Sequence, residues 1–379
     1  MLLRKKLCVA VVIAAILILM LASQGIHKRH FQLPLALPNS RTTITSREAG
    51  VRPTASHAHQ IHEPTPSPPK TLLSEAEDEI IKGEGEKQLI EKPDSSQRPC
   101  GCSESCISDL DGSKWFAQRY DPKQEPVLRY KNNKFDPEAL AWWLSLQRSR
   151  NDQTLEEMMS EMFKVIAPPT VDYRPLPSRC RSCAVVGNSG NLRQSAHGNL
   201  INSHDTVIRM NKAVTRGFEN DVGNRTTHHF LYPESAVDIE HGVSLVLLPF
   251  KLRDMEWVTS ALSTGQVKMT YMRVRERINA DKDKVLVVNP VFFKYVHDHW
   301  TEHHGRYPST GMMAIVFALH ICDQVSVFGY GADQQGNWHH YWEDNRYAGA
   351  FRKTGVHSAD FETEVIHQLA KEGKISLHL

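Results

Sequence analysis

Aromatic residues are almost absent from the first quarter of this sequence. Of the 30 Phe, Trp and Tyr residues in the 379-residue chain, Phe31 alone lies before position 100. Residues 23–99 also hold nine of the 20 prolines, and a segment so poor in packing groups cannot offset the entropy lost on ordering. An excess of one charge is missing too, because 45 Lys and Arg stand against 43 Asp and Glu. This balance excludes a nucleic-acid binder that relies on bulk positive charge, so no nucleic acid is expected as a partner.

The N-terminal segment predicts a membrane anchor followed by a stem. Three basic residues at 4–6 precede sixteen apolar or cysteine residues at 7–22, a run that suffices for a thin bilayer. The alternative is a cleaved signal peptide, because residues 21–23 resemble a cleavage site. Either arrangement sends the rest of the chain into the secretory lumen. We expect a cytoplasmic tail at 1–6, a signal-anchor transmembrane helix at 7–23, a disordered stem at 24–99 and a luminal domain at 100–379.

Cysteine is scarce, and its distribution fits an oxidising compartment. One cysteine lies in the apolar run, and the other six lie at positions 100, 102, 106, 180, 183 and 322. An even number in a luminal domain indicates three disulfides. A zinc site is the alternative, because Cys180 and Cys183 have the Cys-x-x-Cys spacing of metal ligands. The Asn-Arg-Thr sequence at Asn224 is an N-glycosylation signal, which agrees with luminal exposure.

Short apolar runs alternate with amphipathic segments in the C-terminal half. Strands that alternate with helices favour an α/β fold with a mainly parallel sheet flanked by helices. Ligands bind such sheets beyond the carboxyl ends of the strands. We expect buried strands at 183–186, 206–210, 244–250, 284–288 and 324–328, and helices at 156–165, 312–321 and 361–371.

Small and polar residues follow the first two of these strands. Residues 187–191 (GNSGN) match neither a Walker loop nor the dinucleotide G-x-G-x-x-G pattern. Such a turn lets backbone N–H groups and the side chains of Asn188 and Ser189 approach a ligand, although it also serves as a plain strand exit. Asn211 follows the second strand, where its amide can read a base edge or a ribose or simply shape a turn.

Further candidates lie near the expected C-terminal helices. Ser309 or Thr310 can cap the helix that follows, and a helix N-terminus attracts anions. The pair His339 and His340 follows a glycine-containing loop, where a histidine can donate to phosphate or carry a proton. His357 ends the loop before the last helix, with Glu362 five residues on. A histidine with a carboxylate nearby is a candidate general base, and an ordinary surface histidine is the alternative.

Four ordered segments together resemble the sialylmotifs of the animal sialyltransferases. Residues 183–223, 289–331 and 340–343, and His357 with Glu362, match the large, small, third and very small motifs in order and spacing. The resemblance covers nearly all of the expected luminal domain. The segments that look most like the β-galactoside α-2,3-sialyltransferases acting on Gal-β-1,3-GalNAc (core 1 O-glycans) are residues 188–192, 339–342 and 349–357.

The resemblance implies a fold, a reaction and a set of site residues. The fold is a modified GT-A fold with a Rossmann-like nucleotide-binding core, and the reaction is inverting transfer of sialic acid from CMP-N-acetylneuraminate without a metal or other cofactor. His357 is implied as the general base and His340 as a catalytic group at the donor phosphate. Gln147 and Tyr232 are expected as acceptor contacts. The implied donor-binding residues are Asn188, Ser189, Asn211, Tyr271, Tyr307, Ser309, Thr310, Gly311, Gly331 and His339.

The resemblance also implies disulfide pairing and location. The family spacing of the first cysteines is Cys-x-Cys-x-x-Cys, whereas three residues separate Cys102 from Cys106 here, so an exchange of partners among the first two bridges stays open. The family implies a single-pass type II protein of the Golgi membrane, acting on glycoproteins or glycolipids, with a soluble form after stem cleavage. The implied disulfides are Cys100–Cys106, Cys102–Cys180 and Cys183–Cys322.

Two other functions compete with this prediction. A metal-dependent GT-A glycosyltransferase holds its nucleotide through an Asp-x-Asp pair, and the chain has such pairs at 109–111 and 281–283. Neither pair follows an apolar strand, so we interpret both as solvated turns. The second alternative is a luminal glycan-binding protein without turnover, which the presence of His340 and His357 disfavours.

Overall fold

The computed structural model describes residues 99–104, 106–130, 135–146, 153–170, 172–333, 335–344 and 355–379. All of them belong to one compact unit, Glu86–Leu379. The expected tail at 1–6, anchor at 7–23 and nearly all of the stem at 24–99 lie outside the described residues, as does Gln147. Among the helices of the described part, none has the length and apolar character needed to cross a membrane.

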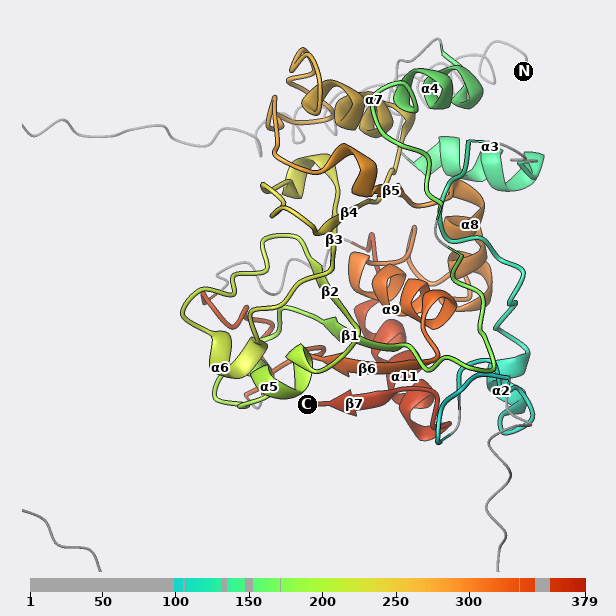
Figure 1. The fold of residues 1–379 in the computed structure, drawn as a ribbon, viewed down its shortest axis with the longest axis vertical. Helices are drawn as coiled ribbons and strands as arrows, with labels where there is room; N and C mark the ends of the chain where they lie inside the picture. The colour runs from blue at the N-terminus through green and yellow to red at the C-terminus, as the bar shows by residue number, and fades with distance from the viewer. Residues whose placement is uncertain are drawn as a thin grey trace, which may run out of the picture. The chain divides into compact units, whose positions relative to one another are not determined.

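A seven-stranded, wholly parallel sheet forms the centre of this unit (Figure 1). The strands are hydrogen-bonded in the order β5-β4-β3-β2-β1-β6-β7. The chain therefore steps outward from β1 to β5 and then returns to the other side of β1 with β6. In such sheets the ligand crevice lies where this direction reverses. The strands are β1 (Ser182–Val186), β2 (Thr206–Met210), β3 (His228–Leu231), β4 (Ser244–Leu247), β5 (Val285–Val287), β6 (Gln324–Phe328) and β7 (Ser376–His378).

The five strands expected from apolar runs are present, and the structure adds two more. β3 begins with His228 and His229, and these polar residues concealed a strand that ends in the buried Phe230 and Leu231. β7 is a three-residue edge strand that is hydrogen-bonded to β6. The expected strand at 244–250 ends early, at Leu247, where the chain turns toward α7. The α/β architecture with a parallel sheet is confirmed.

Helices cover both faces of the sheet. The three expected helices are present as α4, α9 and α11, with slightly different ends. α4 starts with a capping box, in which Thr154 and Glu157 exchange hydrogen bonds. The helices are α2 (Lys114–Ala117), α3 (Pro137–Leu146), α4 (Leu155–Met162), α5 (Gly198–Asn202), α6 (Glu219–Val222), α7 (Leu252–Ala261), α8 (Pro290–His299), α9 (Thr310–Ile321) and α11 (Ala359–Lys371), with short 3₁₀ turns η2 (Gly190–Leu192), η3 (Pro233–Ser235) and η4 (Lys282–Lys284).

The alternation of side chains along β1 shows how the two faces are used. Cys183 and Val185 belong to the large core that contains α9, whereas Ala184 and Val186 belong to a second cluster with residues of α5 and α6. α9 is buried all round from Met312 to Ile321, as expected for a helix that is apolar on every side. It contacts β1, β2, β3 and β6.

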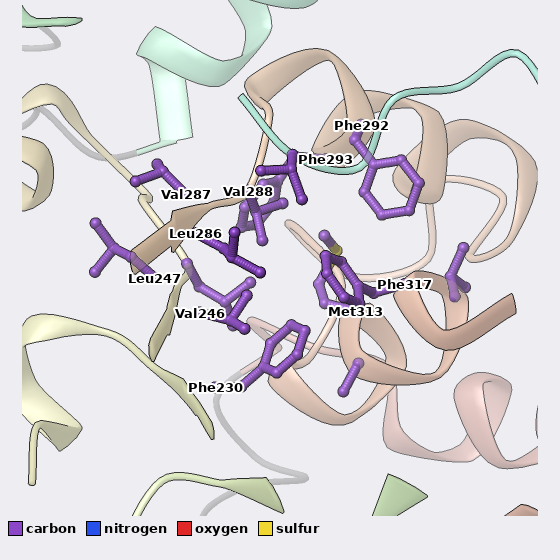
Figure 2. Packing of buried hydrophobic residues seen from close by; sticks show 14 of the residues in the cluster. Phe230, Val246, Leu247, Leu286, Val287, Val288, Phe292, Phe293, Met313 and Phe317 are labelled. Carbon is purple, nitrogen blue, oxygen red and sulfur yellow. The ribbon is translucent and has the colours of Figure 1, made fainter. Parts of the chain in front are cut away.

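Aromatic and branched side chains from the sheet interlock with α8 and α9 (Figure 2). Phe230 of β3 meets Phe317 of α9 edge to face, with ring centroids 5.1 Å apart. Phe293 of α8 joins the same cluster. Because α9 leads into the amino end of β6, this packing holds the opposite end of α9, its N-terminus, at the carboxyl edge of the sheet.

Three disulfides close the structure: Cys100–Cys106, Cys102–Cys180 and Cys183–Cys322. This is the pairing implied by the family resemblance. Cys180 and Cys183 belong to two different bridges, so neither thiolate is available to a zinc ion. The bridge from Cys183 joins β1 to the residue that ends α9, at the amino edge of the sheet.

Candidate active site

A cavity of about 380 Å³ opens beyond the carboxyl ends of β1, β2 and β6. The loops after these strands, the N-terminus of α9 and the start of α11 form its wall. Its position agrees with the crevice that the strand order predicts. Eleven of the residues expected from the sequence line it: Asn188, Ser189, Asn211, Tyr232, Ser309, Thr310, Gly311, Gly331, His339, His340 and His357.

Two glycines bring the loops after β1 and β6 into contact. Gly187 N–H donates to the carbonyl of Phe328 at 2.7 Å, and a Cβ at Gly187 would lie 2.2 Å from the carbonyl oxygen of Gly329. Gly329 has φ +68°, a conformation that favours glycine. The Ser189 N–H donates to the same Gly329 carbonyl at 3.0 Å. This close approach places Asn188 and Ser189 at the cavity.

Two asparagines place unsatisfied oxygens in the wall of the cavity. Asn188 Nδ2 donates to the carbonyl of Met210 at 3.1 Å, and Asn211 has a left-handed backbone with φ +58°. Within the described part of the chain, the Oδ1 atoms of Asn188 and Asn211 are buried and have no hydrogen-bond partner. An unsatisfied buried polar atom costs about 1–3 kcal/mol. Both oxygens are therefore suited to accept hydrogen bonds from amino or hydroxyl groups of a ligand.

His229 of β3 holds the backbone of Asn211. Its Nε2 lies 2.6 Å from the Asn211 carbonyl oxygen, and Asn211 N–H donates to the carbonyl of Phe230 at 2.8 Å. Burial lowers the pKa of His229, so the ring is neutral near pH 7 and donates from Nε2. The sequence did not indicate His229, because the polar residues at the start of β3 conceal that strand.

The N-terminus of α9 is fastened to α11. Ser309 Oγ caps α9 by accepting from Met312 N–H at 3.1 Å, and the Ser309 N–H donates to Glu362 Oε1 at 2.8 Å. The Ser309 hydroxyl donates to the other oxygen of the same carboxylate. Burial raises the pKa of Glu362 to about 7. The fastened helix keeps Thr310 and Gly311 in the cavity wall, where a helix N-terminus favours a phosphate.

His357 is oriented by the backbone and not by Glu362. Its Nδ1 lies 2.9 Å from the Tyr307 carbonyl oxygen, so we assign the proton to Nδ1 and the basic lone pair to Nε2. The Tyr307 ring stands edge-on to the imidazole at 5.1 Å. Burial lowers the pKa of His357. The nearby carboxylate of Glu362 is instead engaged by Ser309.

Two neighbouring side chains hold the ring of His340 in the cavity wall. Its ring stacks on Trp342 with centroids 4.5 Å apart, and Nδ1 lies 3.1 Å from Glu343 Oε1. The hydrogen bond with His340 lowers the pKa of Glu343. The ring is thereby held at a defined place in the cavity wall, where a histidine can contact an anionic ligand.

Two expected residues lie beside the cavity and not in its wall. Tyr307 packs between His357 and Phe250, with its ring centroid 4.9 Å from that of Phe250. Tyr271 is 63% exposed, and its ring lies 5.1 Å from the ammonium of Lys251. The structure thus brings eleven of the expected site residues together in one cavity wall and leaves these two tyrosines outside it.

The family is decided by comparison with known proteins. The model of glycosyltransferase family 29 (sialyltransferase) matches residues 127–374. The chain belongs to this sialyltransferase family. The match spans every residue of the cavity wall, and the assignment made from the four motifs is confirmed.

Individual sialyltransferases resemble the chain over most of its length. It is 51% identical over 300 residues to the mouse CMP-N-acetylneuraminate-beta-galactosamide-alpha-2,3-sialyltransferase 2, covering 79% of this chain and 85% of that protein. It is 47% identical over 312 residues to the human CMP-N-acetylneuraminate-beta-galactosamide-alpha-2,3-sialyltransferase 1, covering 82% and 88%. A mammalian sialyltransferase solved in complex with Gal-beta-1-3GalNAc-ortho-nitrophenol superposes with a TM-score of 0.68 at 46% identity, covering 74% of this chain and 99% of that one.

Tyr330 is a further residue of this sialyltransferase site that the sequence did not single out. It is half-buried and packs against the core, and its hydroxyl donates to the Gly311 carbonyl at 3.1 Å. A Cβ at Gly311 would lie 2.9 Å from the Tyr330 ring, which explains the glycine. Burial raises the pKa of Tyr330. The flanking Gly329 and Gly331 were the available signal, but a tyrosine between two glycines does not show which helix it supports.

Neither Asp-x-Asp pair lies at the sialyltransferase cavity. Asp281 sits at the amino end of β5, where it accepts from His241 Nδ1 at 2.9 Å and from Gly242 N–H at 2.7 Å. Asp109 lies near the C-terminal end of α11, and its carbonyl accepts from Lys374 Nζ. The metal-dependent alternative thus receives no support from these residues, since nucleotides bind at the carboxyl ends of the strands.

Proposed function

We propose that this sialyltransferase transfers sialic acid from CMP-N-acetylneuraminate to the 3-hydroxyl of the terminal galactose in Gal-β-1,3-GalNAc. The observation that carries the proposal is the shared cavity, in which His357 and His340 accompany the unsatisfied oxygens of Asn188 and Asn211. The substrate assignment draws on the relatives and on the solved structure with a Gal-β-1-3GalNAc derivative.

The donor side of the cavity suits a cytidine monophosphate. The oxygens of Asn188 and Asn211 accept hydrogen bonds from ribose hydroxyls or from the exocyclic amine of cytosine. The N–H groups of Thr310 and Gly311 offer partial positive charge to the phosphate, and His340 is the proposed catalytic group beside it. That charge stabilises the transition state more than the ground state, because negative charge grows on the phosphate oxygen as CMP leaves.

The acceptor is activated by His357. Its Nε2 takes the proton of the galactose 3-hydroxyl while that oxygen attacks the anomeric carbon of the sialic acid. The bond from this carbon to the phosphate oxygen breaks, its electron pair leaves with CMP, and the configuration at carbon inverts. The imidazolium later returns its proton to solvent. A base positioned in this way contributes roughly 10²- to 10⁴-fold, and the hydrogen bond to Tyr307 fixes the required tautomer.

The test is sialyl transfer by the purified full-length protein in EDTA. Gal-β-1,3-GalNAc and Gal-β-1,4-GlcNAc serve as acceptors, and mass spectrometry identifies the linkage. We expect EDTA-resistant α-2,3 product on the first acceptor and its loss in folded His357→Ala. Transfer that requires added manganese would overturn the metal-free mechanism, and absence of any sialylated product would overturn the donor assignment.

The location is part of the proposal as well. The apolar run at 7–22 anchors the chain in the Golgi membrane as a single-pass type II protein, with glycoprotein or glycolipid acceptors in the lumen and a soluble form after stem cleavage. Asn224 is exposed, and its Oδ1 accepts from Asn202 Nδ2 at 3.0 Å, so Nδ2, the atom that carries an N-linked glycan, is not used in this contact. Protection from external protease in intact vesicles and a mass shift with an N-glycanase, absent in Asn224→Gln, would support this arrangement.

A further inference from the structure

A buried lysine lies beside the cavity. The side chain of Lys251 is 3% exposed, and its ammonium lies 2.6 Å from Asp254 Oδ1 and 3.6 Å from Glu234 Oε1. The side chains of Asp254 and Glu234 are also buried, with 0% and 5% exposed. Taking such charges out of water costs several kcal/mol per ion, and apolar residues of similar size often serve stability equally well. Stability alone therefore does not account for this buried charged cluster.

The cluster joins three segments at the rim of the site. Glu234 lies in η3, two residues after Tyr232, which lines the cavity. Lys251 and Asp254 lie at the start of α7. The third segment is the loop that carries Tyr271, and it is attached because the hydroxyl of the neighbouring Thr270 donates to the Glu234 carboxylate.

The ammonium of Lys251 also supports the Tyr271 ring directly. It lies 5.1 Å from the ring centroid, within the range of a cation–π interaction, and desolvation strengthens that interaction. The loop itself is closed by hydrogen bonds from Val274 N–H to the Lys268 carbonyl, at 3.0 Å, and from Arg253 Nε to the Met269 carbonyl, at 3.2 Å. An exposed tyrosine is thus held at a defined place by a buried cation.

The surroundings of Tyr271 keep its hydroxyl protonated. Burial, with smaller electrostatic contributions from Glu234, Tyr232 and Tyr307, raises the pKa of Tyr271 to about 12. Its hydroxyl therefore stays protonated at neutral pH and remains a hydrogen-bond donor.

We propose that Lys251 is a positioning residue of the transfer reaction. Its buried ammonium holds Tyr271 by the ring contact and, through Glu234, holds the turn that carries Tyr232. The two tyrosine hydroxyls are thereby aimed at the donor phosphate and the sugar that meet in the cavity. This inference rests on the proposed function, because Tyr271 and Tyr232 are taken to contact the substrates of that reaction.

The decisive variant is Lys251→Met in the purified full-length protein. Displacing substrate-facing groups by about 1 Å can cost roughly 10²-fold in rate, so we expect kcat/KM for sialyl transfer to fall about ten- to a hundredfold. CMP affinity should fall as well, while cytidine, which lacks the phosphate, should bind as before.

Lys374→Met is the matched control. Lys374 is also buried, and its ammonium likewise lies 5.1 Å from an aromatic ring, that of Phe116, away from the residues that line the cavity. We expect this variant to lose thermal stability and to keep kcat/KM. An equal loss of kcat/KM in both variants at a temperature where both are folded would overturn the positioning role.

A double-mutant cycle separates positioning from general damage. If Lys251 acts through Tyr271, then Lys251→Met should add less than about threefold to the loss caused by Tyr271→Ala, because coupled residues are not additive. Fully multiplicative losses would overturn the inference. Should Lys251→Met fail to fold, Glu234→Gln tests the same link, and an unchanged kcat/KM there would likewise overturn it. No transfer by wild-type protein would instead count against the proposed function itself.

Discussion

The two cavity histidines differ in the groups that hold them. The Nδ1 of His357 faces a backbone carbonyl, which favours the neutral ring with its lone pair on Nε2. The Nδ1 of His340 faces the Glu343 carboxylate, and its ring stacks on Trp342. One histidine of the cavity is therefore oriented by a backbone carbonyl and the other by side chains.

The pH dependence of transfer should report His357. Burial lowers its pKa below the usual value near 6.5, so the neutral base persists into mildly acidic solution. We expect kcat/KM to fall on the acidic side with an apparent pKa below 6.5, and His357→Ala to lose roughly 10²- to 10⁴-fold. His241→Ala, which alters an exposed histidine paired with Asp281 at the far edge of the sheet, should keep the wild-type profile. An acidic limb above 7 would contradict this assignment.

Asn211 combines a binding amide with a strained backbone, and two substitutions separate these contributions. Asn211→Gly and Asn211→Ala both remove the unsatisfied oxygen, so each should weaken CMP binding about tenfold, the equivalent of one hydrogen bond. Alanine tolerates φ +58° poorly, at a cost of about 1–2 kcal/mol, so only Asn211→Ala should also unfold more readily. Calorimetric titration with CMP and thermal unfolding measure the two effects, and unchanged CMP affinity in both variants would remove Asn211 from the donor site.

At the scale of elements, the site depends on how α9 and α11 are joined. α9 supplies the N-terminus that faces the cavity, and α11 supplies Glu362, which binds both the N–H and the hydroxyl of Ser309. The two helices lie 38 residues apart in the chain. The buried carboxylate therefore joins the first turn of α11 to the N-terminus of α9 and holds both in the cavity wall.

The burial of Glu362 makes the free energy of unfolding depend on pH in a defined direction. The pKa of Glu362 is raised to about 7 by burial, so between about pH 4.5 and pH 7 the folded state binds more protons than the unfolded state. The contribution of Glu362 to the free energy of unfolding is therefore fully present below pH 4.5 and is lost as pH rises through 7. We expect the free energy of unfolding of the wild type, relative to Glu362→Gln, to decrease by about 2–3 kcal/mol across this range. Urea unfolding at several pH values measures it, and a parallel pH dependence of the two proteins would contradict it.

At the scale of the whole molecule, stabilisation and chemistry occupy opposite edges of the sheet. The cavity opens at the carboxyl ends of the strands, whereas the bridge between Cys183 and Cys322 lies at the amino ends, where β1 and β6 begin side by side. It connects residues 139 positions apart in the chain. A bridge of this span restricts the unfolded chain more than a short one does.

Removing that bridge should therefore change stability far more than catalysis. The double variant Cys183→Ser with Cys322→Ser should lose about 5 kcal/mol of unfolding free energy by the chain-entropy account. Its kcat/KM should stay within about threefold of wild type wherever it is folded, since the cavity residues keep their hydrogen bonds. Loss of activity without loss of stability would show that the bridge shapes the site. Removal of Cys100–Cys106, which spans six residues, should cost less.

The family, the parallel α/β fold and many residues of the cavity wall can be predicted from the sequence. Most of strand β1 and the middle of helix α9 are continuous apolar runs, and β2 is mainly apolar although it contains Arg209, so the local pattern is sufficient to recognise them. The polar residues that follow these strands, among them Asn188 and Asn211, were found because parallel strands bring their carboxyl ends to one edge.

The pairing of side chains that are distant in the chain depends on the folded structure. Nothing in the local sequence shows that Glu362 pairs with Ser309 and not with His357, or that Lys251 supports Tyr271. The strand β3, which carries His229, was missed because its histidines break the apolar pattern although the fold buries them. Hydrogen bonds and ion pairs of this kind depend on where separate elements meet, and that is set by the packing of the whole core and not by the spacing of residues along the chain.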